Sequence, residues 1–303
     1  MKLNPIPNSD LNISPLCLGT MTYGTPVKES DAIELTHWAI DHGINFIDTA
    51  NMYEGYTRTI GSAGGVSEEI LGKALKGKRA QIVLATKVGM KIGPNDDDEG
   101  LSRAHVLREI DRSLKRLQSD HIDLYYMHKP DPKTPIAESV ETFNDLITTG
   151  KVLYWGISNF SAAQISELLQ VCDENGWQRP VILQPPYSLL KRDIEAEILP
   201  LCEKERIAVA PYQVLQGGLL TGKYQRGEEP AQDSRQVQKP EWTMALSDER
   251  FDQLETIQAD ADANQRSLLQ HALLSLLEQP SVVSLVVGVK RIDQIENLLH
   301  AVN

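Results

Sequence analysis

Short apolar segments rich in β-branched residues recur along the whole chain of 303 residues. They are apolar at consecutive positions, which is typical of strands buried on both faces of a parallel sheet. The stretches between them have the spacing of amphipathic helices, as in Leu107, Ile110, Leu114 and Leu117. The sequence therefore predicts eight strand–helix units, with strands at residues 16–18, 44–47, 82–85, 122–127, 152–157, 181–183, 207–210 and 282–287.

No linker or change of composition separates these units, so we expect one α/β domain over residues 1–303. Eight successive units favour a closed (β/α)8 barrel, the TIM barrel, over an open doubly wound sheet. Residues 2–14 contain the turn-like Asn8-Ser9-Asp10, which predicts an N-terminal hairpin at the barrel bottom. Long polar connections at 54–66, 89–100 and 217–247 follow strands, so we expect them at the face where barrel active sites lie.

The composition excludes several classes of protein. Hydrophobic residues make up 41% of the chain and charged residues 24%, as in globular domains. No apolar run approaches the roughly 18 residues that span a bilayer, and the polar start does not resemble a secretory signal. We therefore expect a cytoplasmic protein with no membrane partner.

The net charge and the spacing of the cysteines and histidines limit which ligands the chain is expected to bind. A formal charge of −12 disfavours nucleic acid, so a phosphate-bearing ligand needs a local basic pocket. Cys17, Cys172 and Cys202 lack paired spacing, and the histidines lack the spacing of metal ligands. We expect neither disulfides nor a bound metal.

Four polar residues lie at or just after the ends of three consecutive strands. Asp48 ends the second strand, Tyr53 follows five residues later, Lys87 ends the third strand and His128 the fourth. Each alone has an ordinary explanation, such as a cap or a solvated side chain. Together they predict a joint site at the barrel mouth, because burying such groups without pairing them is costly.

These residue types favour acid–base chemistry on a carbonyl group. An ammonium about 4 Å from a phenol contributes on the order of 4 kcal/mol at an effective dielectric constant near 20. That is enough to lower a tyrosine pKa by roughly two to three units. We expect Tyr53 to be an acidified proton donor, Asp48 to hold Lys87 protonated, and His128 to donate to the carbonyl oxygen. None of them supplies electrons, so a cofactor must do so.

Six motifs occur in an order that resembles the aldo-keto reductase superfamily, and in particular its bacterial NADPH-dependent oxidoreductases. They are LGTM at 18–21, FIDTA at 46–50 with Tyr53, ATK at 85–87, DLYYMH at 123–128, GISNF at 156–160 and LLTGK at 219–223. The resemblance implies Asp48, Tyr53, Lys87 and His128 as the catalytic residues. It also implies an NADPH molecule lying across the barrel mouth, without a separate nucleotide-binding domain.

The same resemblance assigns the cofactor contacts. Ser158, Asn159 and Gln184 would hold the nicotinamide amide and Tyr212 would stack on its ring. The remaining assignments are Gln213, Leu215 and Gly217 to the pyrophosphate, Lys290 and Arg291 to the 2′-phosphate, Gln294 and Asn297 to the adenine, and Gly19, Thr20, Met21, Asp48, Lys223 and Gly288 to the cofactor site in general. Two cations facing a dianionic phosphate favour NADPH over NADH.

The predicted function is the NADPH-dependent reduction of aldehydes or ketones, an oxidoreductase activity of the class acting on CH–OH donors. The small-molecule carbonyl substrate would contact Tyr23, Met52, Tyr56 and Met90. Two alternatives remain open at this point: a barrel lyase that forms a Schiff base on Lys87, and a non-catalytic regulatory subunit that binds NADPH. The natural substrate and the oligomeric state are left open as well.

Overall fold

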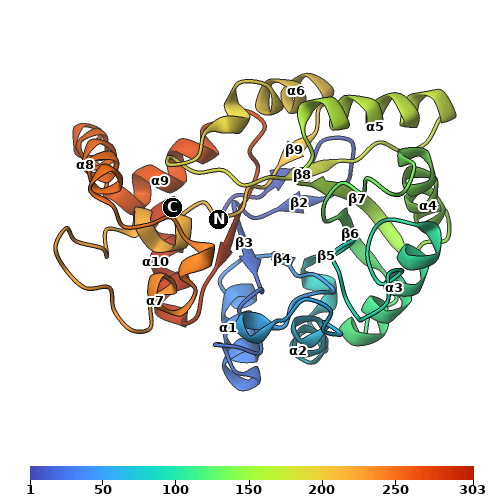
Figure 1. The fold of residues 1–303 in the computed structure, drawn as a ribbon, viewed down its shortest axis with the longest axis horizontal. Coiled ribbons are helices and arrows are strands. Elements are labelled where there is room, and N and C mark those ends of the chain that lie inside the picture. The colour runs from blue at the N-terminus through green and yellow to red at the C-terminus, as the bar shows by residue number, and fades with distance from the viewer.

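A ring of eight parallel strands forms the centre of the computed structural model, which describes residues 1–303 (Figure 1). The strands are β3 (Leu16–Gly19), β4 (Phe46–Asp48), β5 (Val83–Val88), β6 (Ile122–Met127), β7 (Val152–Ser158), β8 (Ile182–Gln184), β9 (Ala208–Val209) and β10 (Leu285–Gly288). Their order is β10-β3-β4-β5-β6-β7-β8-β9. The amide of Val283 donates to the carbonyl of Val209 at 3.0 Å, and Val286 donates to Pro211 at 2.9 Å, which joins β9 to β10. The predicted (β/α)8 barrel is confirmed.

Helices cover the outside of this ring (Figure 1). They are α1 (Glu29–Asp41), α2 (Val66–Ala74), α3 (Arg103–Leu117), α4 (Ile136–Thr148), α5 (Ala162–Asn175), α6 (Ile198–Glu205), α7 (Arg235–Gln238), α8 (Asp248–Ala263), α9 (Leu268–Leu277) and α10 (Ile292–Val302). Short 3-10 helices are η1 (Gly55–Thr57), η2 (Arg79–Gln81), η3 (Asp193–Glu195), η4 (Gln216–Thr221) and η5 (Pro240–Trp242). Only α7 and α8 go beyond one helix for each strand, and both follow β9.

The alternation of side chains along the strands divides the core in two. Val83 and Ala85 of β5 belong to a small cluster inside the ring, whereas Leu84 and Val88 belong to the large cluster beneath the helices. Lys87 has the same parity as Val83 and Ala85, so it lies on the inner side of β5, near its carboxyl end. The position of this lysine therefore follows from the pleat of the strand.

The N-terminal hairpin closes the bottom of the barrel, as predicted. Strands β1 (Asn4–Pro5) and β2 (Asn12–Ile13) pair antiparallel, and Ile6 and Ile13 pack into the inner cluster. The amide of Asn4 also donates to the carbonyl of Val283, just before β10, at 2.8 Å. The hairpin thus covers the end of the barrel opposite to the mouth.

Two helices beside the catalytic strands approach each other closely. A Cβ atom placed on Gly72 of α2 would lie 2.2 Å from the carbonyl oxygen of Arg116 on α3. Such a distance leaves no room for a side chain, so glycine at this position permits the contact. None of the helices combines the length and the apolar character that crossing a membrane requires.

Candidate active site

Lys87 is the centre of a buried cluster at the carboxyl ends of β4 and β5. Its Nζ atom lies 2.5 Å from Oδ2 of Asp48 and donates to the carbonyl of Thr49 at 2.8 Å. It also donates to the hydroxyl of Tyr53 at 3.3 Å. Since an ammonium has three N–H donors, these contacts satisfy the lysine completely.

The charges of this cluster hold Lys87 protonated. Burial disfavours its ammonium form, but Asp48 and Tyr53 outweigh that effect and raise the pKa of Lys87 above its usual 10.5. Burial raises the pKa of Tyr53 above 10.0, and the nearby ammonium offsets this only in part. The expected acidification of Tyr53 is therefore not found: desolvation is the larger effect, and the phenol stays protonated at neutral pH.

His128 follows β6 and faces the phenol. Its ring and that of Tyr53 lie 6.1 Å apart, centroid to centroid, at an angle of 82°. Burial, with the cations of Lys87, Lys129 and Arg58, lowers the pKa of His128 well below 6.5. The imidazole is thus neutral, and its buried Nδ1 has no hydrogen-bond partner within the protein.

Side chains from β7 and β8 continue the site on the other side of Asp48. Gln184 donates to Oδ1 of Asp48 at 2.8 Å, and the hydroxyl of Ser158 donates to the carbonyl of Gln184 at 2.7 Å. Asn159 adopts a left-handed φ of 65° and accepts a hydrogen bond from the hydroxyl of Tyr212 at 2.8 Å. The site therefore runs as one hydrogen-bonded unit from β4 across β7 and β8 to the segment after β9.

A cavity of about 990 Å³ opens over this unit at the barrel mouth. All seventeen residues predicted to contact the cofactor line it, together with Tyr53, His128 and the predicted substrate residues Met52, Tyr56 and Met90. Lys87 is fully buried and is not part of the cavity wall. The cavity extends from the phenol of Tyr53 to Arg291 and Asn297 near the start of α10.

Tyr23 was expected at the substrate site, and that assignment is wrong. Its side chain is fully buried in the large core cluster, and its hydroxyl bonds to Thr36 of α1 at 2.8 Å. Tyr23 follows the first strand in the sequence, like the other chosen residues, but its side chain turns towards the helices.

Four cations gather in one part of the cavity wall, which we call the basic end: Lys223, Arg235, Lys290 and Arg291. Burial, Arg235 and the other cations lower the pKa of Lys290, although Asp233 opposes them. Arg291 lies 3.2 Å from Oδ2 of Asp233, and Nζ of Lys290 donates to the carbonyl of Asp233 at 2.7 Å. In a chain with a charge of −12, such a cluster is a local exception.

The long connection at 217–247 covers one side of the cavity. Nε of Arg235 donates to the hydroxyl of Tyr56 at 3.1 Å, and the ring of Trp242 meets the ring of Tyr56 edge-on at 5.5 Å. The sequence indicated that this connection rises over the site, but Arg235 and Trp242 were not among the predicted site residues. Only the location of the connection after a strand pointed to them.

The structure holds no metal-ligand cluster: no three His, Cys, Asp or Glu side chains group so that they could bind an ion. A nicotinamide dinucleotide does fit the residues present. The cavity wall contains a neutral histidine with an unpartnered buried nitrogen and also the four cations of the basic end. This combination matches an elongated ligand that carries phosphate groups.

A (β/α)8 barrel with this buried lysine–carboxylate–phenol cluster at its mouth defines a barrel enzyme with its active site at the carboxyl ends of the strands. The model of the aldo/keto reductase family matches residues 15–303, and the chain belongs to this family. Membership supports oxidoreductase activity that depends on a nicotinamide cofactor.

Individual relatives resemble the chain over nearly its whole length. Aldo-keto reductase YhdN of Bacillus subtilis is 34% identical, with 98% of this chain and 88% of the relative covered. A probable voltage-gated potassium channel subunit beta of Arabidopsis thaliana is also 34% identical, with 100% and 92% covered. The holo form of aldo-keto reductase AKR11C1 from Bacillus halodurans superposes with a TM-score of 0.81 at 30% identity, covering 100% of this chain and 91% of that one.

Proposed function

We propose that the protein is an NADPH-dependent reductase of aldehydes or ketones, with Tyr53 as the general acid. The observation that carries this proposal is the contact of Lys87 with both Asp48 and Tyr53, since Asp48 and Tyr53 line the same cavity as the four cations of the basic end. Proton transfer and phosphate recognition are thereby joined by one continuous cavity.

The residues of the chain divide the chemistry among them. When bound, the nicotinamide would supply a hydride, a hydrogen together with its electron pair, from its C4 atom to the carbonyl carbon. Tyr53 donates its proton to the carbonyl oxygen, and the ammonium of Lys87 stabilises the phenolate that remains. Asp48 balances the charge of Lys87, and the neutral ring of His128 offers one N–H to the same oxygen.

The same cavity supports the choice of NADPH. The polar groups of Ser158, Asn159 and Gln184 would hold the amide end near Tyr53. Lys290 and Arg291 would meet a 2′-phosphate, and Asp233, which now contacts both, is the group that such a phosphate would displace. Charge-assisted hydrogen bonds to a dianion favour NADPH over NADH.

The substrate side of the cavity suits an apolar carbonyl compound. Met52 and Met90 contribute thioether surface to its wall, and Tyr56 adds an aromatic ring that lies against Arg235 and Lys290 of the basic end. Met52 and Tyr56 come from the connection after β4, which also carries Tyr53, and Met90 comes from the connection after β5. We propose that they set the substrate preference.

A Schiff-base lyase is not favoured. Lys87 would have to reach the substrate as a free amine, but its ammonium is buried, its donors are satisfied, and its pKa is raised. A nucleophilic lysine needs the opposite shift.

The relative from Arabidopsis gives a second candidate function, that of a subunit regulating another protein. Steady-state turnover distinguishes the two functions. Purified protein should be tested with a panel of aldehydes and ketones, using NADPH and then NADH, and followed at the absorbance band of the reduced nicotinamide. Rapid NADPH oxidation with at least one carbonyl compound supports the reductase. Tight NADPH binding with no turnover across the panel favours the regulatory subunit.

A further inference from the structure

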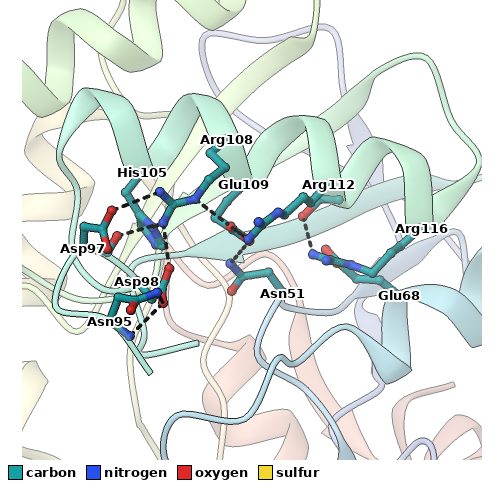
Figure 2. A network of polar contacts seen from close by, with 11 residues as sticks. Asn51, Glu68, Asn95, Asp97, Asp98, His105, Arg108, Glu109, Arg112 and Arg116 are labelled. Carbon is teal, nitrogen blue, oxygen red and sulfur yellow. Dashed lines mark hydrogen bonds and ion pairs between the residues drawn. The ribbon is translucent and has the colours of Figure 1, made fainter. Parts of the chain in front are cut away.

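A network of polar contacts joins charged side chains of α3 to residues of neighbouring segments (Figure 2). Its members on α3 are His105, Arg108, Glu109, Arg112 and Arg116, whose spacing places them along one side of the helix. In Figure 2 they point from α3 towards Asn51, Glu68 and the segment 95–98. None of these residues entered the site predicted from the sequence.

Glu109 is one of two fully buried glutamates in this network, and Glu68 is the other. The side chain of Glu109 is fully inaccessible, with Nη1 of Arg112 at 2.8 Å and Nε of Arg108 at 3.6 Å from Oε1. Its other oxygen, Oε2, accepts a hydrogen bond from Nδ2 of Asn51 at 3.3 Å. Oδ1 of Asn51 is buried without a partner, so Glu109 is the only side chain that holds this amide.

Asn51 lies in the turn that carries Tyr53. Its backbone N–H donates to the carbonyl of Lys87 at 3.2 Å, and the N–H of Tyr53 donates to Ala50 at 3.1 Å. Asn51 is fully buried and takes no part in the cavity wall. The contact with Glu109 therefore supports the turn from the side opposite to the substrate.

Arg108 connects the same carboxylate to a second active-site connection. Its Nη2 atom donates to the carbonyl of Asp97 at 2.8 Å and to Oδ1 of Asp98 at 3.0 Å. Asp98 in turn accepts from the backbone N–H of Asn95 at 2.9 Å. This segment belongs to the connection at 89–100, which places Met90 in the cavity wall.

We propose that Glu109 is a positioning residue for Tyr53. Its carboxylate fixes the turn through Asn51 and, through Arg108, ties that turn to the connection carrying Met90. It never touches a ligand and acts by holding the hydroxyl of Tyr53 at its place beside Lys87. The inference rests on the proposed role of Tyr53 in reduction.

A double-mutant cycle tests the proposal. Asn51→Ala and Glu109→Ala should each lower kcat about tenfold, because small displacements of a reacting group are costly. The double variant should lose no more than Glu109→Ala alone, since removing Asn51 has no further effect once its partner is gone. The Kd for NADPH, measured by fluorescence, should stay within about twofold, because the cofactor contacts are unchanged. Glu109→Gln keeps an acceptor for Asn51 and should recover most of kcat.

Glu68 supplies the matched control. This glutamate is equally buried on the neighbouring α2, but it accepts from Thr86 at 2.6 Å and Arg116 at 2.6 Å and does not contact Asn51. Glu68→Ala should lower thermal stability and leave kcat close to that of the wild type. If Glu109→Ala acted only through a loss of stability, Glu68→Ala would lower kcat by a similar factor.

Hydrogen–deuterium exchange gives a readout that needs no activity. In the free protein, peptides covering residues 48–56 and 89–100 should exchange faster in Glu109→Ala than in the wild type. In Asn51→Ala only the first peptide should change. Peptides from α9, across the barrel from α3 (Figure 1), should be unaffected in both variants.

The outcomes separate the inference from the proposed function. Any of three results would overturn the positioning role. They are an unchanged kcat in Asn51→Ala, losses that multiply in the double variant, and a loss of kcat in Glu68→Ala as large as that in Glu109→Ala. If Glu109→Ala does not fold, Asn51→Ala alone decides. If the wild type reduces no carbonyl compound, the proposed function fails, and the exchange experiment still decides whether Glu109 holds the turn.

Discussion

Nζ of Lys87 lies 2.5 Å from Oδ2 of Asp48, and the two side chains are 0% and 2% exposed. Another ion pair in the chain, Arg179 with Asp173, has the same 2.5 Å separation but lies at the surface, with 37% and 53% exposed. Equal distances therefore occur in opposite surroundings. A buried charge left without its partner costs far more than an exposed one.

Asp48→Asn should consequently lower the free energy of unfolding by about 3–5 kcal/mol, because the ammonium of Lys87 then stays buried without a counter-charge. Asp173→Asn removes an equally short ion pair that is exposed to water, and it should lower the free energy of unfolding much less. Urea unfolding followed by circular dichroism measures both variants. Similar losses in the two would show that burial does not govern the strength of the Lys87 pair.

The pKa values predict an unusual pH profile for reduction. The active form of Tyr53 is protonated, and its raised pKa keeps it so until the pH rises above about 10. His128 is neutral at neutral pH, and its lowered pKa keeps it neutral as the pH falls through 6.5. We expect kcat/KM for the carbonyl compound to stay level between these values and to fall only on the alkaline side. An alkaline loss centred near pH 7 would mean that Lys87 acidifies Tyr53 after all.

The fold was predictable because strands buried on both faces appear in the sequence as runs of consecutive apolar residues. Each expected strand begins and ends within a few residues of the observed one, as with 122–127 and β6 (Ile122–Met127). Strand ends also identified Asp48, Lys87 and His128, since a polar residue after a buried strand is conspicuous.

Other features depend on side-chain direction and distance, which residue spacing does not encode. Tyr23 follows a strand yet packs against α1, and the direction of the Tyr53 pKa shift depends on how completely the phenol is buried. Arg235 comes from a long connection with no periodic pattern. Glu109 looked like one more polar residue on an amphipathic helix, because only the tertiary structure shows that Asn51 lies against it.

The basic end predicts cofactor preference. Replacing Lys290 and Arg291 together by alanine should weaken NADPH binding on the order of 10²-fold, because two charge-assisted contacts with the 2′-phosphate disappear. NADH, which lacks that phosphate, should be affected little. Fluorescence titration with each nucleotide measures the difference, with Lys151→Ala, a surface lysine paired with Asp111, as the control. Equal weakening of both nucleotides would place the phosphate elsewhere.

The close approach of α2 and α3 predicts the sign of a stability change. Alanine is ordinarily favoured over glycine inside a helix by up to about 1 kcal/mol. Gly72→Ala should nevertheless destabilise the protein by about 1–3 kcal/mol, because its Cβ would collide with the carbonyl of Arg116. Thermal or urea unfolding shows which effect is larger, and a more stable variant would contradict the tight contact.

The most direct measurement is single-turnover reduction by Tyr53→Phe, which removes one hydroxyl and leaves the ring in place. If Tyr53 donates the proton, the rate should fall by roughly 10² to 10⁴ while NADPH binds as tightly as in the wild type. A variant that binds NADPH normally and reduces the carbonyl compound at the wild-type rate would contradict the role of Tyr53.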